Sequence, residues 1–414
     1  MSKRRVVVTG IGTVNPLGNS VEQSWNTVIR GQSGIGPITR FDASHLPTQI
    51  AGEVREFDYR DYFEGDMAKK AKRMDNFCHY AVAAAREAAE QADLSSLDNR
   101  QRIGVGLGSG IGGLNVQYEN SVALENKGPR RVSPFYIPMS IGNMASGILS
   151  IVYGATGPNI SMQTACATAN HSIAMSQMII SNNMADVMIA GGAESTINEI
   201  SVVAFGNMRA LSTRNDAPGR ASRPYDRDRD GFVLSEGAAV LILEEYEHAK
   251  RRGAPILCEV LACGMSGDAY DFVAPDPEGR GADYAMRMAL EQAEISASDI
   301  DYVNTHGTST PVGDRAELLG VRSVFGEGEE RPYVGSTKGY HGHLLGATAG
   351  IEAILTICAM RDGIVPANIN IETPDHDMPK VKLPTENVKT EVRTALSNSF
   401  GFGGHNSSLV LRAL

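Results

Sequence analysis

Cysteine is scarce in this sequence, and its spacing matches no paired-cysteine motif. The 414 residues include five cysteines, at positions 78, 166, 258, 263 and 358, and no two of them form a Cys-x-x-Cys pair. Structural zinc sites and small disulfide scaffolds both depend on closely spaced cysteines. The pattern therefore argues against a metal centre of that kind and indicates a reducing compartment, which we expect to be the cytoplasm.

Long apolar runs and excess positive charge are also missing. No apolar run reaches the roughly 20 residues that a membrane-spanning helix needs. The first residues, MSKRRVVVTGIG, lack the apolar stretch of a secretion signal. The formal net charge of −10 argues against nucleic-acid binding over a broad surface. We therefore expect no membrane insertion and no nucleic-acid partner.

The sequence is rich in glycine, with 44 residues, and its apolar segments alternate between two kinds. Short continuous apolar runs are typical of buried strands, which we expect at Arg5–Gly10, Ile103–Gly108, Asp186–Gly192, Gly237–Glu245, Ile256–Cys263, Tyr302–Thr305, Tyr333–Ser336, Ala395–Ser399 and Ser408–Leu411. Longer segments of helical character, some of them rich in alanine, predict helices at Val21–Gly31, Met67–Asp93, Ile141–Tyr153, Thr168–Ile180, Ala282–Ala293, Asp314–Val324 and Leu345–Met360. This alternation indicates an α/β fold with largely parallel, helix-covered sheets.

The chain also shows signs of two halves. Gly253-Ala254-Pro255 interrupts the regular pattern and predicts a boundary between residues 1–254 and residues 255–414. The segment Tyr333–Met360 has the same layout as Ile160–Ile180, namely a strand, a polar turn and a helix rich in small residues. This repetition indicates an internal duplication.

One cysteine lies where a predicted strand ends and a helix begins. The run Ile160–Thr164 leads into Ala165-Cys166-Ala167, and the helical segment follows at once. Backbone N–H groups and the positive end of the helix dipole converge at such a point and favour a nucleophilic thiolate. The alternative is a buried structural cysteine, because free cysteine is among the most buried residue types.

Three further stretches place polar residues after predicted strands, where open α/β sheets have their active sites. They are NTHGTST at 304–310, STKGYHGH at 336–343 and NSFGFGGHN at 398–406. A cysteine nucleophile needs a base, an orienting group and an oxyanion hole. A second histidine indicates a second task, such as hydrogen bonding to a thioester oxygen while negative charge develops on it.

Together these motifs resemble one protein family. TACATAN around Cys166, NTHGTSTPVGD around His306, STKGYHGHLLGATAG around His343 and NSFGFGGHN near the end are similar to the β-ketoacyl-[acyl-carrier-protein] synthases, closest to type II. VVVTGIGTVNPLGNS near the start and SRPYDRDRDGFVLSEGA at 222–238 are similar as well. The resemblance covers essentially the whole chain.

The resemblance implies a fold, an assembly and a reaction. The family has the thiolase fold, a five-layer αβαβα sandwich of two duplicated halves, and usually forms a homodimer. Its members elongate fatty acids by a decarboxylating Claisen condensation. They need no cofactor, because the substrates are carried on the phosphopantetheine of acyl carrier protein.

The resemblance also implies a role for each matching residue. Cys166 takes the acyl group, while His306 and His343 assist the loss of CO₂ and stabilise the enolate. The N–H groups of Cys166 and Phe402 form the oxyanion hole. The remaining implied residues are Lys338 for electrostatic organisation, Glu352 and Asn398 in support, Thr308 and Thr310 for the pantetheine arm, Ile111 and Phe400 for substrate, Phe402 as a gate, and Asn304, Glu352 and Asn398 for a structural monovalent or divalent cation that some members hold.

A local basic patch can exist on an acidic protein. We expect an acidic carrier protein to dock on such a patch, and the alternative is an ordinary solvated surface. The candidate residues are Lys69, Lys70, Lys72, Arg73, Arg130, Arg131 and Arg209.

Two positions depart from the family pattern, and several related functions compete. His341 stands where many relatives have threonine, and Asp271-Phe272-Val273 replaces a frequent His-hydrophobic-Thr. A non-enzymatic partner subunit would lack Cys166, and a priming synthase would have asparagine at His343. A thiolase would have a second cysteine near the C-terminus, and NSFGFGGHN has none. A ketosynthase of a specialised polyketide or polyene pathway remains an alternative.

Overall fold

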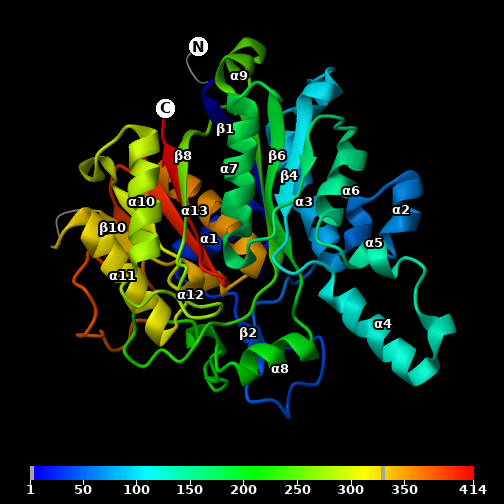
Figure 1. Cartoon of the computed structure of the whole chain (residues 1–414), viewed down its shortest axis with the longest axis horizontal. Helices are drawn as coiled ribbons and strands as arrows, with labels where there is room; N and C mark the ends of the chain where they lie inside the picture. The colour runs from blue at the N-terminus through cyan, green and yellow to red at the C-terminus, as the bar shows by residue number, and fades with distance from the viewer. Residues whose placement is uncertain (1–3, 328–331) are drawn as a thin grey trace.

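The computed structural model describes residues 4–327 and 332–414 and is organised around one large sheet (Figure 1). Over these residues the sheet has ten strands in the order β10-β9-β13-β14-β8-β1-β7-β6-β4-β5. Their bounds are Val6–Val14 (β1), Ile103–Gly108 (β4), Asn159–Ile160 (β5), Val187–Glu194 (β6), Gly237–Glu245 (β7), Cys258–Gly267 (β8), Tyr302–Asn304 (β9), Tyr333–Gly335 (β10), Thr394–Gly401 (β13) and His405–Arg412 (β14). Two small hairpins pair Gly36–Pro37 (β2) with Ile50–Ala51 (β3) and Ile364–Val365 (β11) with Val388–Lys389 (β12).

The strand order shows the predicted duplication. The five strands of the first half are, in chain order, β1, β4, β5, β6 and β7. From the edge of the sheet inward they lie in the order β5, β4, β6, β7 and β1, which are the third, second, fourth, fifth and first of these strands along the chain. The second half repeats this order with β8, β9, β10, β13 and β14. The halves join where β1 pairs with β8 through Val7 and Val8. The boundary at residue 254, between the helix Tyr246–Arg252 and β8, stays a prediction.

Helices cover the sheet in layers. Their bounds are Val21–Ile29 (α1), Gly65–Ala71 (α2), Asn76–Gln91 (α3), Leu114–Lys127 (α4), Tyr136–Ser140 (α5), Met144–Tyr153 (α6), Thr168–Ser181 (α7), Glu199–Asn207 (α8), Tyr246–Arg252 (α9), Arg280–Ala293 (α10), Pro311–Phe325 (α11), Lys338–His341 (α12) and Thr348–Asp362 (α13). The pair α3 and α6 covers the first half, α10 and α11 cover the second, and α7 and α13 pack together between them. The predicted five-layer αβαβα sandwich is thereby confirmed.

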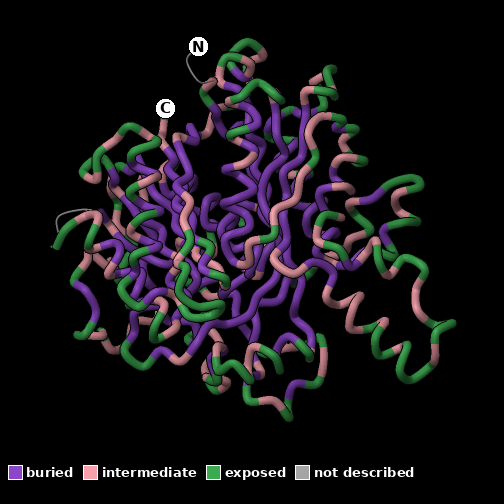
Figure 2. The backbone as a smooth tube through the Cα atoms, in the orientation of Figure 1, coloured by how far each residue is buried: buried purple, intermediate pink, exposed green. Residues whose placement is uncertain are grey.

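The sheet is mixed, so the expectation of largely parallel strands was wrong. Pairing is antiparallel through the middle, along β13-β14-β8-β1-β7-β6, and parallel only toward the two ends, within β4-β5-β6 and β9-β10-β13, in the described chain. Helices cover both faces whatever the strand direction, so the middle strands are largely buried and contain continuous apolar runs, as parallel strands do. All nine residues of β1 and of β7 are buried, and Figure 2 shows the burial concentrated there.

Some helix predictions also need correction. Met67–Asp93 is two helices, because the Asp75 side chain accepts the Phe77 N–H and starts α3 afresh. The helices α4 and α8 were not predicted, and Tyr246–Arg252 is helical. No helix in the described ranges is both long enough and apolar enough to cross a membrane.

Close helix-to-sheet packing recurs in both halves through glycine. A Cβ atom on Gly12 of β1 would lie 2.1 Å from the Ala84 carbonyl of α3. A Cβ atom on Gly264 of β8 would likewise lie 2.0 Å from the Ala285 carbonyl of α10. Backbone contact of this kind fixes each outer helix against its strand, and the strand ends then hold the loops of the site in place.

Candidate active site

Cys166 lies in a short turn that leads directly into α7. The turn, Ala165–Ala167 (η5), places Ala165 at a φ of +49°, a left-handed conformation. Thr168 closes the turn, since its Oγ1 accepts the Thr164 N–H at 2.9 Å and donates to the Ala165 carbonyl at 2.7 Å. The thiol is only 7% exposed. The local backbone therefore fixes the thiol at the start of a central helix.

The second half contains the same turn. Leu345–Ala347 (η8) leads into α13, Leu345 has a φ of +46°, and Thr348 Oγ1 lies 3.0 Å from His343 Nδ1. The two central helices thus start side by side. His343 Nε2 comes to 3.0 Å from Cys166 Sγ, which joins a residue of each half in one hydrogen bond.

His306 completes a three-residue cluster. It follows β9, and the N–H groups of His306 and Gly307 donate to the Glu317 carboxylate at 2.8 and 2.7 Å. Its ring centroid lies 5.4 Å from that of His343. The sulfur and one ring nitrogen of each histidine lie within 4.8 Å of one another. Among the described residues, His306 Nδ1 has no hydrogen-bond partner.

Burial decides the protonation of the cluster. It raises the pKa of the Cys166 thiol to about 12, and the Lys338 ammonium only partly opposes this rise. It also holds the pKa of His306 and of His343 well below the ordinary value, and Lys338 adds to both shifts. These shifts favour a neutral thiol and two neutral imidazoles at rest, and they oppose the thiolate that the helix start favours.

Lys338 and Glu352 form a buried ion pair beside the cluster. Lys338 opens α12, Glu352 lies on α13, and both side chains are at most 1% exposed. Glu352 Oε2 and Asn304 Oδ1 have no hydrogen-bond partner within the described ranges. Asn398 donates to Glu317 and accepts from Ser408. Two free oxygens fit the predicted cation, and its binding here stays a prediction.

A cavity of about 400 Å³ opens onto the cluster. Two hydroxyls lie in its wall, Thr308 Oγ1 and Thr310 Oγ1, 3.1 Å apart. Ile111 packs in an apolar group with Cys166 and Leu345. The predicted residues that line this cavity are Cys166, His306, His343, Ile111, Thr308, Thr310, Phe400, Phe402 and Arg209.

Gly401 lies against the Cys166 amide so closely that a Cβ atom there would be 3.1 Å from the nitrogen. The next residue, Phe402, lines the cavity together with Cys166. The oxyanion hole formed by the N–H groups of Cys166 and Phe402 stays a prediction. The Phe402 ring lies 6.5 Å from that of Phe205, and the Phe400 ring lies 5.8 Å from that of His306.

Both departures from the family pattern lie near the site without entering the cluster. His341 is buried, and its ring nitrogens lie 3.0 Å from Thr337 Oγ1 and 2.7 Å from the Gly342 carbonyl oxygen. Asp271 accepts the N–H groups of Val273 and Ala274 in a turn at the cavity. Phe272, in the same turn, is 81% exposed.

Six of the seven candidate docking residues lie in α2 and the two residues just after it or in the turn Pro129–Arg131, and we call these two segments the basic corner. The Arg73 guanidinium lies 4.3 Å from the centre of the Phe135 ring, four residues after that turn. Arg209 lies apart from this contact, in the wall of the cavity.

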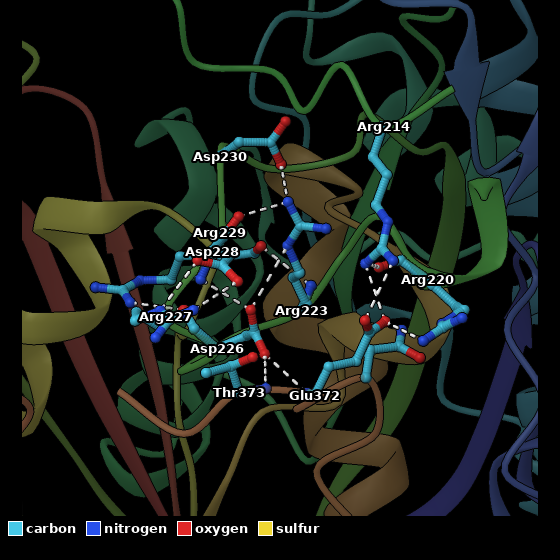
Figure 3. A network of polar contacts seen from close by, with 12 residues as sticks. Arg214, Arg220, Arg223, Asp226, Arg227, Asp228, Arg229, Asp230, Glu372 and Thr373 are labelled. Atoms are coloured by element: carbon cyan, nitrogen blue, oxygen red, sulfur yellow. Dashed lines mark hydrogen bonds and ion pairs between the residues drawn. The ribbon is translucent and has the colours of Figure 1, made fainter. Parts of the chain in front are cut away.

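Arginine and acidic side chains between residues 214 and 230 form a network of ion pairs and hydrogen bonds with Glu372 and Thr373 (Figure 3). Asp226 accepts the N–H groups of Glu372 and Thr373, each at 2.7 Å. Arg229 donates to the Thr310 carbonyl and pairs with Asp314 and Asp375. The network therefore ties the 222–238 motif to the start of α11.

Several residues of the site were missed from the sequence. Glu317 anchors His306, Thr348 orients His343, and Phe232 stacks edge-on against His343 at 5.2 Å. Glu317 lies eleven positions after His306 and about two turns into α11, and a carboxylate on the buried side of that helix was the available signal.

Comparison with known proteins identifies the family. The model described as "Beta-ketoacyl synthase, N-terminal domain" matches residues 3–249, and "Beta-ketoacyl synthase, C-terminal domain" matches residues 257–372. The chain belongs to the beta-ketoacyl synthase family. A relative from Vibrio harveyi named 3-oxoacyl-[acyl-carrier-protein] synthase 2 is 48% identical, with both chains covered fully. A relative of the same name from Coxiella burnetii is 47% identical over 99% of each chain.

Solved structures agree with this family. A beta-ketoacyl synthase from Burkholderia phymatum has a TM-score of 0.91 and 31% identity, covering 99% of this chain and 100% of that one. A chain from a complex of a type II polyketide acyl-carrier protein with its ketosynthase has a TM-score of 0.90 and 30% identity over the full length of both.

Removing Arg229 should destabilise the protein in a pH-dependent way. Asp314 is fully buried, and burial already raises its pKa to about 6, with Arg229 opposing the rise. In Arg229→Met the pKa of Asp314 rises further, so the folded variant loses stability as the pH rises through that range. Breaking such a buried pair costs about 3–5 kcal/mol.

We therefore expect the loss in melting temperature for Arg229→Met to be larger at about pH 8 than at about pH 5. Thermal denaturation followed by circular dichroism measures it. The matched control is Arg227→Met, since Arg227 is exposed and pairs only with exposed Asp228 in the described chain. Equal losses at both pH values for Arg229→Met would contradict this view of the network.

Proposed function

We propose that this protein elongates acyl chains by decarboxylating condensation, as a 3-oxoacyl-[acyl-carrier-protein] synthase of the second type. The observation that carries the proposal is the 3.0 Å contact between Cys166 Sγ and His343 Nε2, with His306 beside it and a cavity in front. A nucleophile, a base and a second neutral hydrogen-bond donor suit acyl transfer followed by carbanion chemistry.

In the first half-reaction the thiol becomes a nucleophile only when it reacts. His343 Nε2 takes the proton of Cys166, and the thiolate attacks the carbonyl carbon of the acyl thioester. The N–H groups of Cys166 and Phe402 hydrogen-bond to the oxyanion. The tetrahedral intermediate then expels the carrier thiolate, which takes up the proton, and the acyl group remains on Cys166.

In the second half-reaction the malonyl thioester supplies the carbon nucleophile. The carbon–carbon bond to its carboxylate breaks, CO₂ leaves, and the electron pair forms an enolate. Neutral His306 and His343 donate hydrogen bonds to the enolate oxygen without protonating the carbon, and for this step the proton of His343 lies on Nε2 while Nδ1 accepts from Thr348 Oγ1. The carbanion attacks the acyl-Cys166 carbonyl and displaces the Cys166 thiolate, which gives the 3-oxoacyl thioester. The thiolate then takes up a proton from solvent, which restores the thiol.

A ketosynthase of a polyketide pathway is the second candidate, because solved polyketide ketosynthases share the fold. Relatives named 3-oxoacyl-[acyl-carrier-protein] synthase 2 are 45–48% identical over nearly the whole chain, against 30% for those structures. The identity therefore favours fatty-acid elongation. Cys166 argues against a non-enzymatic partner subunit.

Single substitutions should affect acyl transfer and decarboxylation to different extents. Cys166→Ala should abolish acylation, because no other side chain replaces the sulfur. His306→Ala should lower CO₂ release about 100-fold or more, and acylation far less, since general acid–base and hydrogen-bonding groups contribute about 10²–10⁴. His343→Ala should lower both, because His343 is also the base for Cys166.

Intact-protein mass spectrometry measures the acyl-enzyme, and labelled malonyl-carrier protein reports CO₂ release. His405→Ala is the matched control, since His405 is exposed and lies outside the cavity wall. Normal condensation by Cys166→Ala would rule out the proposed nucleophile. Equal loss of both activities in His306→Ala would contradict the role of His306.

We propose acyl carrier protein as the partner, docked on the basic corner at α2 and Pro129–Arg131. Opposite charges steer association, and salt screens them. Lys70→Glu with Arg131→Glu should raise the KM for carrier protein about tenfold and weaken its salt dependence. The control is Lys250→Glu with Arg251→Glu on α9, which makes the same charge change elsewhere. Unchanged KM and salt dependence would place the dock elsewhere.

We propose a cytoplasmic homodimer in which two copies meet at β5. This short strand ends the sheet, and unpaired strand edges are rarely left open. Exposed apolar side chains nearby include Ile137 and Ile151, at 61% and 64% exposure. Light scattering should give twice the chain mass, and Ile137→Asp with Ile151→Asp should halve it. A monomeric wild type would refute the dimer.

All five cysteines of the described chain are free, which suits the cytoplasm.

A further inference from the structure

A buried carboxylate lies behind the cavity and takes no part in the reaction described above. Glu194 ends β6 and is 0% exposed. Its Oε1 accepts hydrogen bonds from Ser109 Oγ at 2.9 Å and Ile111 N at 3.2 Å. Its Oε2 accepts from Gly110 N at 2.8 Å and Gly346 N at 2.9 Å. Four donors therefore occupy the four lone-pair sites of the carboxylate.

These donors belong to two walls of the cavity, one from each half. The segment 109–111 follows β4 and includes Ile111. Gly346 lies in the turn after His343 and directly follows Leu345. Ile111 and Leu345 both line the cavity and pack in the same apolar cluster as Cys166. Glu194 thus accepts hydrogen bonds from the backbone N–H of Ile111 and from that of Gly346, the residue after Leu345.

The two segments touch backbone to backbone around this carboxylate. A Cβ atom on Gly346 would lie 2.2 Å from the Gly110 nitrogen and 2.8 Å from Glu194 Oε2. A Cβ atom on Gly110 would lie 2.7 Å from the same oxygen. With no side chain between them, the hydrogen bonds to Glu194 are what hold the two segments at this separation.

We propose that Glu194 is a positioning residue that sets the distance between Ile111 and Leu345, and thereby the acyl-chain length that the cavity accepts. The proposal rests on the proposed function, because it concerns the acylation of Cys166. Glu194 does not line the cavity, so it acts through the backbone of the two walls.

Glu194→Gln tests this role with almost no change in volume. One carboxylate oxygen becomes an NH₂ group, which faces either the backbone N–H of Ile111 or those of Gly110 and Gly346 and repels them. The Ile111 segment then moves away from Leu345, and the cavity widens. We expect the ratio of Cys166 acylation rates for fourteen-carbon over six-carbon acyl carrier protein to rise at least about threefold relative to wild type. Intact-protein mass spectrometry gives both rates.

Glu87→Gln is the matched control. The Glu87 carboxylate also accepts two backbone amides, from Val21 at 2.9 Å and Thr13 at 3.0 Å, and it lies outside the cavity wall. In Glu87→Gln the ratio of acylation rates for fourteen-carbon over six-carbon acyl carrier protein should change less than about threefold relative to wild type. A merely structural role of Glu194 would slow both chain lengths together, so a ratio that rises less than threefold in Glu194→Gln overturns the proposal.

If circular dichroism shows that Glu194→Gln does not fold, a second variant takes its place. Ser109→Ala removes one donor from Oε1 and leaves the carboxylate in place, and the same threshold then decides the matter. Wild-type protein serves as the test of the underlying activity. If neither acyl group reaches Cys166 in wild type, the proposed function fails. If wild type is acylated and the ratio does not rise in the variant, only the role of Glu194 fails.

Discussion

The site depends on one hydrogen bond across the two halves, between Cys166 Sγ and His343 Nε2 at 3.0 Å. The two partners belong to different halves of the chain, Cys166 to the first and His343 to the second. They meet because α7 and α13 are the central layer and start side by side, each after a turn with a left-handed residue, Ala165 or Leu345. The duplication therefore does more than enlarge the core, since it places two equivalent helix starts at one point. One start supplies the nucleophile and the other supplies its base.

Desolvation then determines how this pair works. The cluster is buried, so a neutral thiol beside a neutral imidazole costs less than a thiolate beside an imidazolium. The Lys338 ammonium lowers the pKa of the Cys166 thiol and of both histidines. Glu352 limits the effect of this positive charge, because it forms an ion pair with Lys338. Two neutral histidines suit the carbon chemistry, because an imidazolium would protonate the carbanion. Buried carboxylates hold the surrounding loops by their amides: Glu317 holds the His306 turn, and Glu194 holds the walls of the cavity.

Much of this could be predicted from the sequence, and the remainder depends on tertiary contacts. The start of α7 at Thr168 and the whole of β7 follow from local pattern, because apolar runs and small-residue periodicity reflect burial directly. Strand direction did not follow, since helices cover both faces of the sheet. The break at Asp75 was hidden because alanine and lysine spacing continues through it. The pKa of Cys166 could not be predicted for a related reason: a helix start is visible in the sequence, and the depth of its burial is not. Glu194 binds backbone amides of two segments that lie far away in the sequence, which no local motif records.

Infrared spectroscopy of the S–H stretch measures the protonation of Cys166 at rest, on which this mechanism depends. A difference spectrum between wild type and Cys166→Ala isolates the band of this thiol from those of the other four cysteines. We expect the band to be present at neutral pH and to persist well above it, because burial raises the thiol pKa to about 12. Absence of the band at neutral pH, with the signature of a protonated imidazole, would show a resting thiolate–imidazolium pair and rule out the neutral pair.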